Sequence, residues 1–74
     1  MLEKLKEIIV NYVEVNPDEI TTESRFIEDI GLNSYDFMCM LGDIEEEFGI
    51  SVDETEIVNL RTVGEAIAYF ESIQ

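Results

Sequence analysis

One serine in this chain lies where a helix is expected to begin, shortly after a glycine turn. Ser34 comes three residues after Gly31 and directly precedes the apolar stripe of a predicted helix. The first backbone N–H groups of a helix lack intrahelical partners, and together with the helix dipole they favour negative charge. The pattern therefore favours a phosphate on or near the Ser34 hydroxyl, although it equally suits an ordinary N-cap serine.

The lack of histidine and the single cysteine exclude most enzyme mechanisms. The chain has no histidine, so Ser–His, Cys–His and histidine–metal arrangements are absent. Cys39 is the only cysteine, which excludes an intrachain disulfide and is typical of a reducing compartment. The acidic window 29–40 lacks the glycine and the final glutamate of an EF-hand calcium loop. We therefore expect no catalytic residue and no metal site.

Four helical patterns position these residues. Apolar side chains recur at three- and four-residue spacing along most of the sequence. Gly49 is a natural helix stop, and Thr62 with Glu65 forms a capping-box pattern before the last helix. The predicted helices span about residues 2–15, 34–48, 54–58 and 63–73.

The connection over residues 16–33 is long, and its apolar content predicts that it packs onto the helices. The sequence thus predicts an all-α fold, a bundle of three main helices plus one short helix with a long first loop. The chain of 74 residues is expected to form one domain, residues 1–74.

The charge balance limits the partners of this protein. Eighteen Asp and Glu residues face four Lys and Arg residues, which gives a net charge of -14 at pH 7. Such a field repels nucleic acid and anionic membranes, and it favours protein partners with basic docking patches. The longest apolar run, residues 37–41, is far shorter than a bilayer-spanning helix, and the amphipathic start does not resemble a secretion signal. We expect a monomeric cytoplasmic protein.

The segment around Ser34 and the spacing after it resemble the acyl carrier proteins of the phosphopantetheine-attachment family. The run Phe26-Ile27-Glu28-Asp29-Ile30-Gly31 is similar to the segment that leads to the family's prosthetic-group site, and Ser34 falls where the family carries its modified serine. An acidic second helix ending in residues 45–48 and the helix start at Thr62-Val63 follow in the same order. The resemblance covers nearly the whole chain.

This resemblance implies a non-catalytic carrier with the acyl-carrier-protein-like four-helix bundle fold. A 4′-phosphopantetheine arm from coenzyme A would be joined to the Ser34 hydroxyl and would hold acyl intermediates of fatty-acid or related biosynthesis as thioesters. The implied partners are a phosphopantetheinyl transferase and acyl-transferring and ketosynthase-type enzymes. The implied docking residues are Asp36, Met38, Glu45 and Glu46. By resemblance an acyl pocket is lined by Phe26, Ile44, Val52, Leu60, Ala66 and Tyr69, which any small helical core would equally bury.

Four residues depart from the family pattern. Asn33 stands where the family usually has Asp before the serine, which bears on recognition by the loading transferase. Tyr35 replaces a usual aliphatic residue, Cys39 occupies a position that is often acidic, and Asp53 replaces a common Pro. These departures indicate a specialised carrier. Two alternatives stay open, a carrier of polyketide, aminoacyl or peptidyl thioesters, and an acidic adaptor that keeps the fold without the arm.

Overall fold

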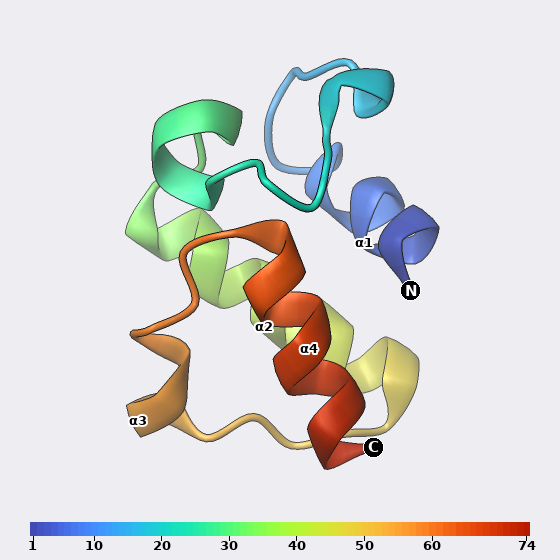
Figure 1. Cartoon of the computed structure of the whole chain (residues 1–74), viewed down its shortest axis with the longest axis vertical. Helices are drawn as coiled ribbons and strands as arrows, with labels where there is room; N and C mark the ends of the chain where they lie inside the picture. The colour runs from blue at the N-terminus through green and yellow to red at the C-terminus, as the bar shows by residue number, and fades with distance from the viewer.

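The computed structural model describes residues 1–74, and its regular structure is entirely helical (Figure 1). The connection between the first two long helices contains a 3₁₀ turn, η1, and a single π-helical turn, η2. The all-α prediction is therefore confirmed. In chain order the elements are α1 (Leu2–Ile9), η1 (Pro17–Glu19), η2 (Phe26–Ile30), α2 (Ser34–Phe48), α3 (Glu54–Ile57) and α4 (Val63–Ile73).

Helix α1 is shorter than the predicted span to Val15, because it ends at Ile9. Beyond it, the N–H groups of Asn11 and Tyr12 donate to carbonyls three residues earlier, at 3.1 and 3.0 Å. The Val13 N–H donates to the Ile9 carbonyl at 3.4 Å, and this mostly tighter turn keeps Tyr12 and Val13 packed against the core. The apolar spacing therefore extends past the end of the helix.

Helix α2 ends as predicted at Gly49, whose φ of 65° is left-handed and whose N–H donates to the Glu45 carbonyl. The start of α2 differs in one detail from the expected serine cap. The N-cap is Asn33, whose side-chain oxygen accepts the Asp36 N–H at 2.7 Å. Ser34 is therefore the first helical residue, and its side chain is not occupied in capping.

The predicted capping box of α4 is confirmed. The Thr62 hydroxyl accepts the Glu65 N–H at 3.1 Å, and a Glu65 carboxylate oxygen accepts the Thr62 N–H at 3.0 Å. The short helix α3 begins at Glu54 as predicted and ends one residue early, with Asp53 as its N-cap. Both helix starts therefore follow from side chains that accept backbone N–H groups.

The long connection is fastened to the start of α4 by three backbone hydrogen bonds. The Phe26 N–H donates to the Arg61 carbonyl at 3.0 Å, and next to it Arg25 and Thr62 form an isolated antiparallel bridge. Further along, two N–H groups of the first turn of α4 donate to carbonyls of the connection at 2.9 and 2.8 Å, from Val63 to Ser24 and from Gly64 to Thr22. The connection also buries Ile20, Phe26, Ile30 and Leu32, which confirms that it packs onto the helices.

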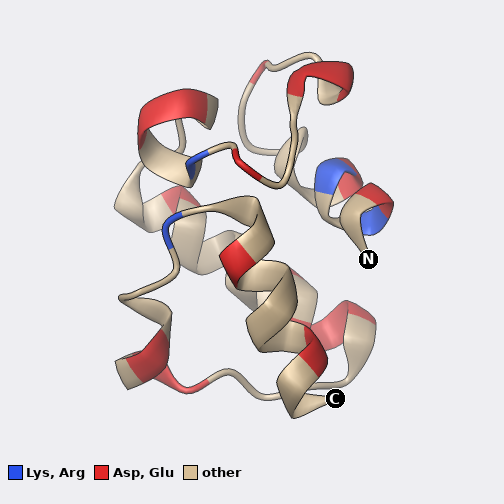
Figure 2. Cartoon of the chain, viewed as in Figure 1, with Lys and Arg blue, Asp and Glu red and all other residues tan.

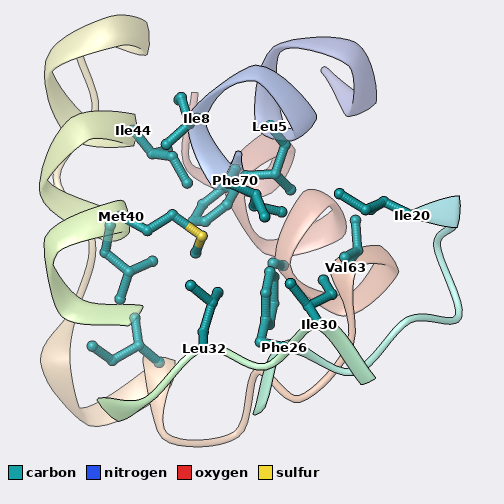
Figure 3. Close-up of a cluster of buried hydrophobic side chains, with 14 residues drawn as sticks. Leu5, Ile8, Ile20, Phe26, Ile30, Leu32, Met40, Ile44, Val63 and Phe70 are labelled. Atoms are coloured by element: carbon teal, nitrogen blue, oxygen red, sulfur yellow. The ribbon is translucent and has the colours of Figure 1, made fainter. Parts of the chain in front are cut away.

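The core lies between α1, α2, α4 and the connection, and every one of its 14 buried side chains is apolar (Figure 3). Met40 and Ile44 of α2 point toward Phe70 of α4, beside Leu5 and Ile8 of α1. No polar or charged residue is buried.

Candidate functional site

Ser34 lies exposed at the N-terminus of α2, where it lines a surface pocket of about 590 Å³. We call this the Ser34 pocket. It has ten lining residues, seven of them hydrophobic. They are Phe26, Ile27 and Glu28 of η2, Ser34, Phe37 and Met38 of α2, and Ile57, Val58, Leu60 and Arg61 in and after α3.

Two aromatic rings connect this pocket to the core. Phe26 is 1% exposed, and its ring centroid lies 5.1 Å from that of Phe37, at an interplanar angle of 53°. Such tilted aromatic pairs are favourable and resist rearrangement. By contrast Ile27, Met38 and Val58 keep 49%, 47% and 75% of their surface exposed. The pocket therefore combines a packed aromatic base with an accessible apolar rim.

The backbone at Ser34 offers hydrogen-bond donors beside its hydroxyl. Asn33 accepts two N–H groups of the first turn, that of Asp36 on its side chain and that of Phe37 on its carbonyl at 2.9 Å. The N–H groups of Ser34 and Tyr35 make no hydrogen bond within the chain. Together with the positive end of the α2 dipole, these two donors suit an anion bonded to the Ser34 hydroxyl.

Acidic residues are spread over the chain and basic residues are few (Figure 2), and the two arginines near the pocket differ in their partners. The Arg25 guanidinium donates to Asp29 at 3.0 and 3.1 Å and also forms an ion pair with Glu28. The hydrogen bonds from the Arg25 side chain, and then that from its backbone N–H, hold the pKa of Asp29 below its usual value. Arg61 lines the pocket without a carboxylate within 4.0 Å of its guanidinium.

The four predicted docking residues all lie on α2. Met38 is exposed and lines the Ser34 pocket, so the apolar docking position and the pocket rim are continuous. Glu46 is exposed, whereas Asp36 and Glu45 are half-buried. Glu45 also has a structural role, because its carboxylate accepts the Val52 N–H at 3.1 Å.

The six predicted acyl-pocket residues are divided between two places. Phe26 and Leu60 line the Ser34 pocket. Ile44 and Ala66 are completely buried in the core, while Val52 and Tyr69 are half-buried and pack against it. The Tyr69 hydroxyl accepts the Asp53 N–H at 2.8 Å. These last four residues do not line the Ser34 pocket.

Six further lining residues were not among the predicted site residues. Ile27 and Glu28 belong to a π-helical turn, which produces no regular hydrophobic period in the sequence. Phe37 has the spacing of a core residue, and only the structure shows that one side of it meets the pocket. The others are Ile57, Val58 and Arg61. The sequence offered one sign of these lining residues. Apolar residues such as Ile27 and Val58 stand at positions that belong to no helical apolar stripe.

Comparison with known proteins places this site in context. Residues 3–70 match the family described as the phosphopantetheine attachment site. The chain is 41% identical over 69 residues to an acyl carrier protein of Clostridium perfringens, covering 93% of this chain and 91% of the relative. It is 35% identical over 72 residues to one of Wolinella succinogenes, covering 97% and 95%, and 33% identical over 73 residues to one of a Sulfurovum species, covering 99% and 97%. None of the helices has the length and apolar character needed to cross a membrane.

Proposed function

The chain belongs to the acyl carrier proteins of the phosphopantetheine-attachment family, and we propose that Ser34 is the residue to which its 4′-phosphopantetheine arm is joined. The observation that carries this proposal is the position of Ser34. It is an exposed hydroxyl on the first residue of α2, on the rim of an apolar pocket. Of the chain's four serines, only Ser34 lines this pocket.

The residues present fit the group. A phosphodiester on the Ser34 hydroxyl would lie beside the N–H groups of Ser34 and Tyr35, which have no partner within the chain. Because Asn33 already caps the helix, the serine hydroxyl is free to be modified without loss of the cap. The apolar rim formed by Ile27, Met38 and Val58 offers contact surface for an acyl chain.

The bound arm supplies a terminal thiol that holds the acyl group as a thioester. The chain itself is a non-catalytic carrier, which accords with a sequence without histidine and a core without polar residues. Phe26 and Leu60 would contact cargo in the Ser34 pocket. Longer acyl chains would have to enter the core. There they would contact Ile44 and Ala66, which are buried in it, and Val52 and Tyr69, which pack against it.

The acidic face of α2 is the surface we propose for docking. Asp36, Glu45 and Glu46 would meet basic patches on the transferase and on acyl-transferring and ketosynthase-type enzymes, while Met38 would supply an apolar contact next to the reactive end. With a net charge of -14, copies of this chain repel one another, which favours a monomer. We propose that it acts in the cytoplasm in fatty-acid or a related thioester-based biosynthesis.

The test is intact-mass spectrometry after incubation of the apo-protein with coenzyme A, Mg²⁺ and a broad-specificity phosphopantetheinyl transferase. A single phosphopantetheine adduct is expected on the wild type and on Ser51→Ala, which removes another exposed hydroxyl at a distance from the pocket. No adduct is expected on Ser34→Ala. An unmodified wild type beside a known carrier modified in parallel would instead favour an acidic adaptor, and an adduct on Ser34→Ala would refute the assignment of the site.

A further inference from the structure

One cation at the Ser34 pocket has no role in the ion pairs of the fold. The chain has four Lys and Arg residues. Three of them pair with carboxylates, since Lys4 contacts Glu7 and Glu47, Lys6 contacts Glu3, and Arg25 contacts Glu28 and Asp29. Arg61 has no carboxylate within 4.0 Å of its guanidinium.

The absence of a partner at Arg61 follows from the way the neighbouring charges are used. Phe26 donates its N–H to the Arg61 carbonyl, so Arg61 lies directly beside the segment that contains Arg25. Arg25 already holds the carboxylates of Glu28 and Asp29. Glu28 lines the pocket but pairs with Arg25, and the Glu65 carboxylate accepts the backbone N–H groups of Arg61 and Thr62.

The backbone of Arg61 is fixed on both sides. Its carbonyl accepts the Phe26 N–H at 3.0 Å, and its own N–H donates to a Glu65 carboxylate oxygen at 3.2 Å. From this anchored position Arg61 lines the pocket that also contains Ser34. Seven of the ten lining residues are hydrophobic, and Arg61 is the one cationic residue among the ten.

We propose that Arg61 binds the oxyanion that the group on Ser34 brings into the pocket. This inference rests on the proposed attachment at Ser34. Two parts of that group carry the same chemistry, the phosphodiester next to the serine and the free carboxylate of an acyl cargo that ends in one. A guanidinium donates paired N–H groups to either oxyanion. In a chain of charge -14, it is the one Lys or Arg side chain left free to do so.

The arginine content of the chain makes the test direct. Only Arg25 and Arg61 are present, so a proton–nitrogen NMR spectrum of the arginine side chains contains two Nε–H signals, assigned with Arg61→Lys. Four forms of the wild type are compared, namely apo, holo, acetyl-loaded and malonyl-loaded, after each has been verified by intact mass. Arg25, which does not line the pocket and is paired with Glu28 and Asp29, is the internal control.

The Arg61 signal is expected to shift and to exchange more slowly with water when the oxyanion arrives, while the Arg25 signal stays in place. A shift already present in the holo form identifies the phosphodiester as the ligand. A shift confined to the malonyl form, and absent with acetyl, identifies the cargo carboxylate. In the form that shows it, Arg61→Gln should change the resonance of the bound group, phosphorus or labelled carboxylate carbon, whereas Lys6→Gln, which removes the same charge on α1, should not.

Failure of this inference is distinguishable from failure of the proposed function. Adducts on Ser34 with an unchanged Arg61 signal in all loaded forms would overturn the role of Arg61 and leave the carrier assignment standing. Absence of any adduct by mass would overturn the carrier assignment, and the role of Arg61 with it.

Discussion

The backbone of Gly64 touches the backbone of Thr22. The Gly64 N–H donates to the Thr22 carbonyl at 2.8 Å, and a Cβ built on Gly64 would lie 2.9 Å from that same oxygen and 3.2 Å from the Thr22 Cβ. This close approach brings the long connection against the first turn of α4. The φ of Gly64 is not in the left-handed region, so its backbone conformation does not require glycine. Glycine is required there because a Cβ would collide with Thr22.

We therefore expect Gly64→Ala to lower the free energy of unfolding by about 1–3 kcal/mol, as overpacking of a fixed backbone contact usually does. Gly42→Ala is the matched control, since Gly42 lies exposed inside α2 and a Cβ there would meet nothing within 4 Å. It should stabilise the protein by about 0.5–1 kcal/mol through the higher helix propensity of alanine. Urea unfolding of both variants checks this, and equal effects of the two substitutions would contradict it.

Capping and modification at the start of α2 are expected to depend on different residues. Asn33→Ala removes the oxygen that accepts the Asp36 N–H, and it should cost about 1 kcal/mol of unfolding free energy. Ser34→Ala should change that free energy by less than about 0.5 kcal/mol, because the serine hydroxyl is exposed and makes no hydrogen bond. Thermal or urea unfolding of the apo-proteins measures both. A larger loss in Ser34→Ala than in Asn33→Ala would show that the serine is the cap.

The hydrogen bond from the Tyr12 hydroxyl to Asp43 joins the turn after α1 to α2. Accepting this hydrogen bond, the Asp43 carboxylate raises the pKa of Tyr12 to about 12. Because that value exceeds the pKa of about 10 of an unfolded tyrosine, the contribution of Tyr12 to stability is complete below pH of about 10 and is lost as the pH rises toward 12.

Tyr12→Phe should therefore be less stable than the wild type near neutral pH, and the difference should shrink in alkaline solution. Urea unfolding at several pH values gives the difference, and tyrosinate absorbance follows the ionisation itself. Tyr35→Phe is the control, because Tyr35 is 76% exposed and its hydroxyl makes no hydrogen bond. A stability difference between wild type and Tyr12→Phe that does not change with pH would contradict the prediction.

The acidic face of α2 is expected to affect the rate of loading by the transferase. Glu46→Gln should lower kcat/KM for phosphopantetheine transfer by about 1.5- to 5-fold at low ionic strength, the range that corresponds to one exposed ion pair of 0.2–1 kcal/mol. The loss should diminish as salt is added. Glu71→Gln, the same change at an exposed position of α4, should leave the rate unchanged. Equal losses in both variants would indicate an effect of net charge alone.

The helix ends that the sequence predicted well are those set by a local side-chain or glycine signal. The Gly49 stop and the Thr62–Glu65 capping box act within a few residues, so the pattern can be identified without tertiary structure. The end of α1 was overestimated by six residues, because Asn11 and Tyr12 donate to carbonyls three residues earlier, in a tighter turn where Tyr12 and Val13 still pack against the core. Here tertiary contacts determine the structure, and periodicity alone could not distinguish the two.

The site could be predicted only in part for a similar reason. Ser34 is marked by its spacing from Gly31, whereas the pocket beside it forms only where residues 57–61 fold back against η2 and the start of α2. The role of Asn33 as the cap was missed because Ser34 and Asn33 are both good N-cap residues and adjacent. The free charge of Arg61 depends on which carboxylates Arg25 occupies, and this pairing exists only in the folded protein.

The hydrogen bonds between the long connection and α4 hold one side of the Ser34 pocket more firmly than the other. Behind η2, backbone hydrogen bonds from Phe26, Val63 and Gly64 form a rigid seam. The opposite side is α3, a single turn whose backbone–backbone hydrogen bonds all stay within residues 53–60, and whose one tie to α4 is the hydrogen bond from the Asp53 N–H to the Tyr69 hydroxyl. An acyl group too large for the pocket would therefore displace α3 and leave the hydrogen bonds of the seam intact. The ease with which α3 moves would then set a gradual upper limit to the size of the acyl group in the pocket. Substitutions in α3 would change this limit without moving Ser34.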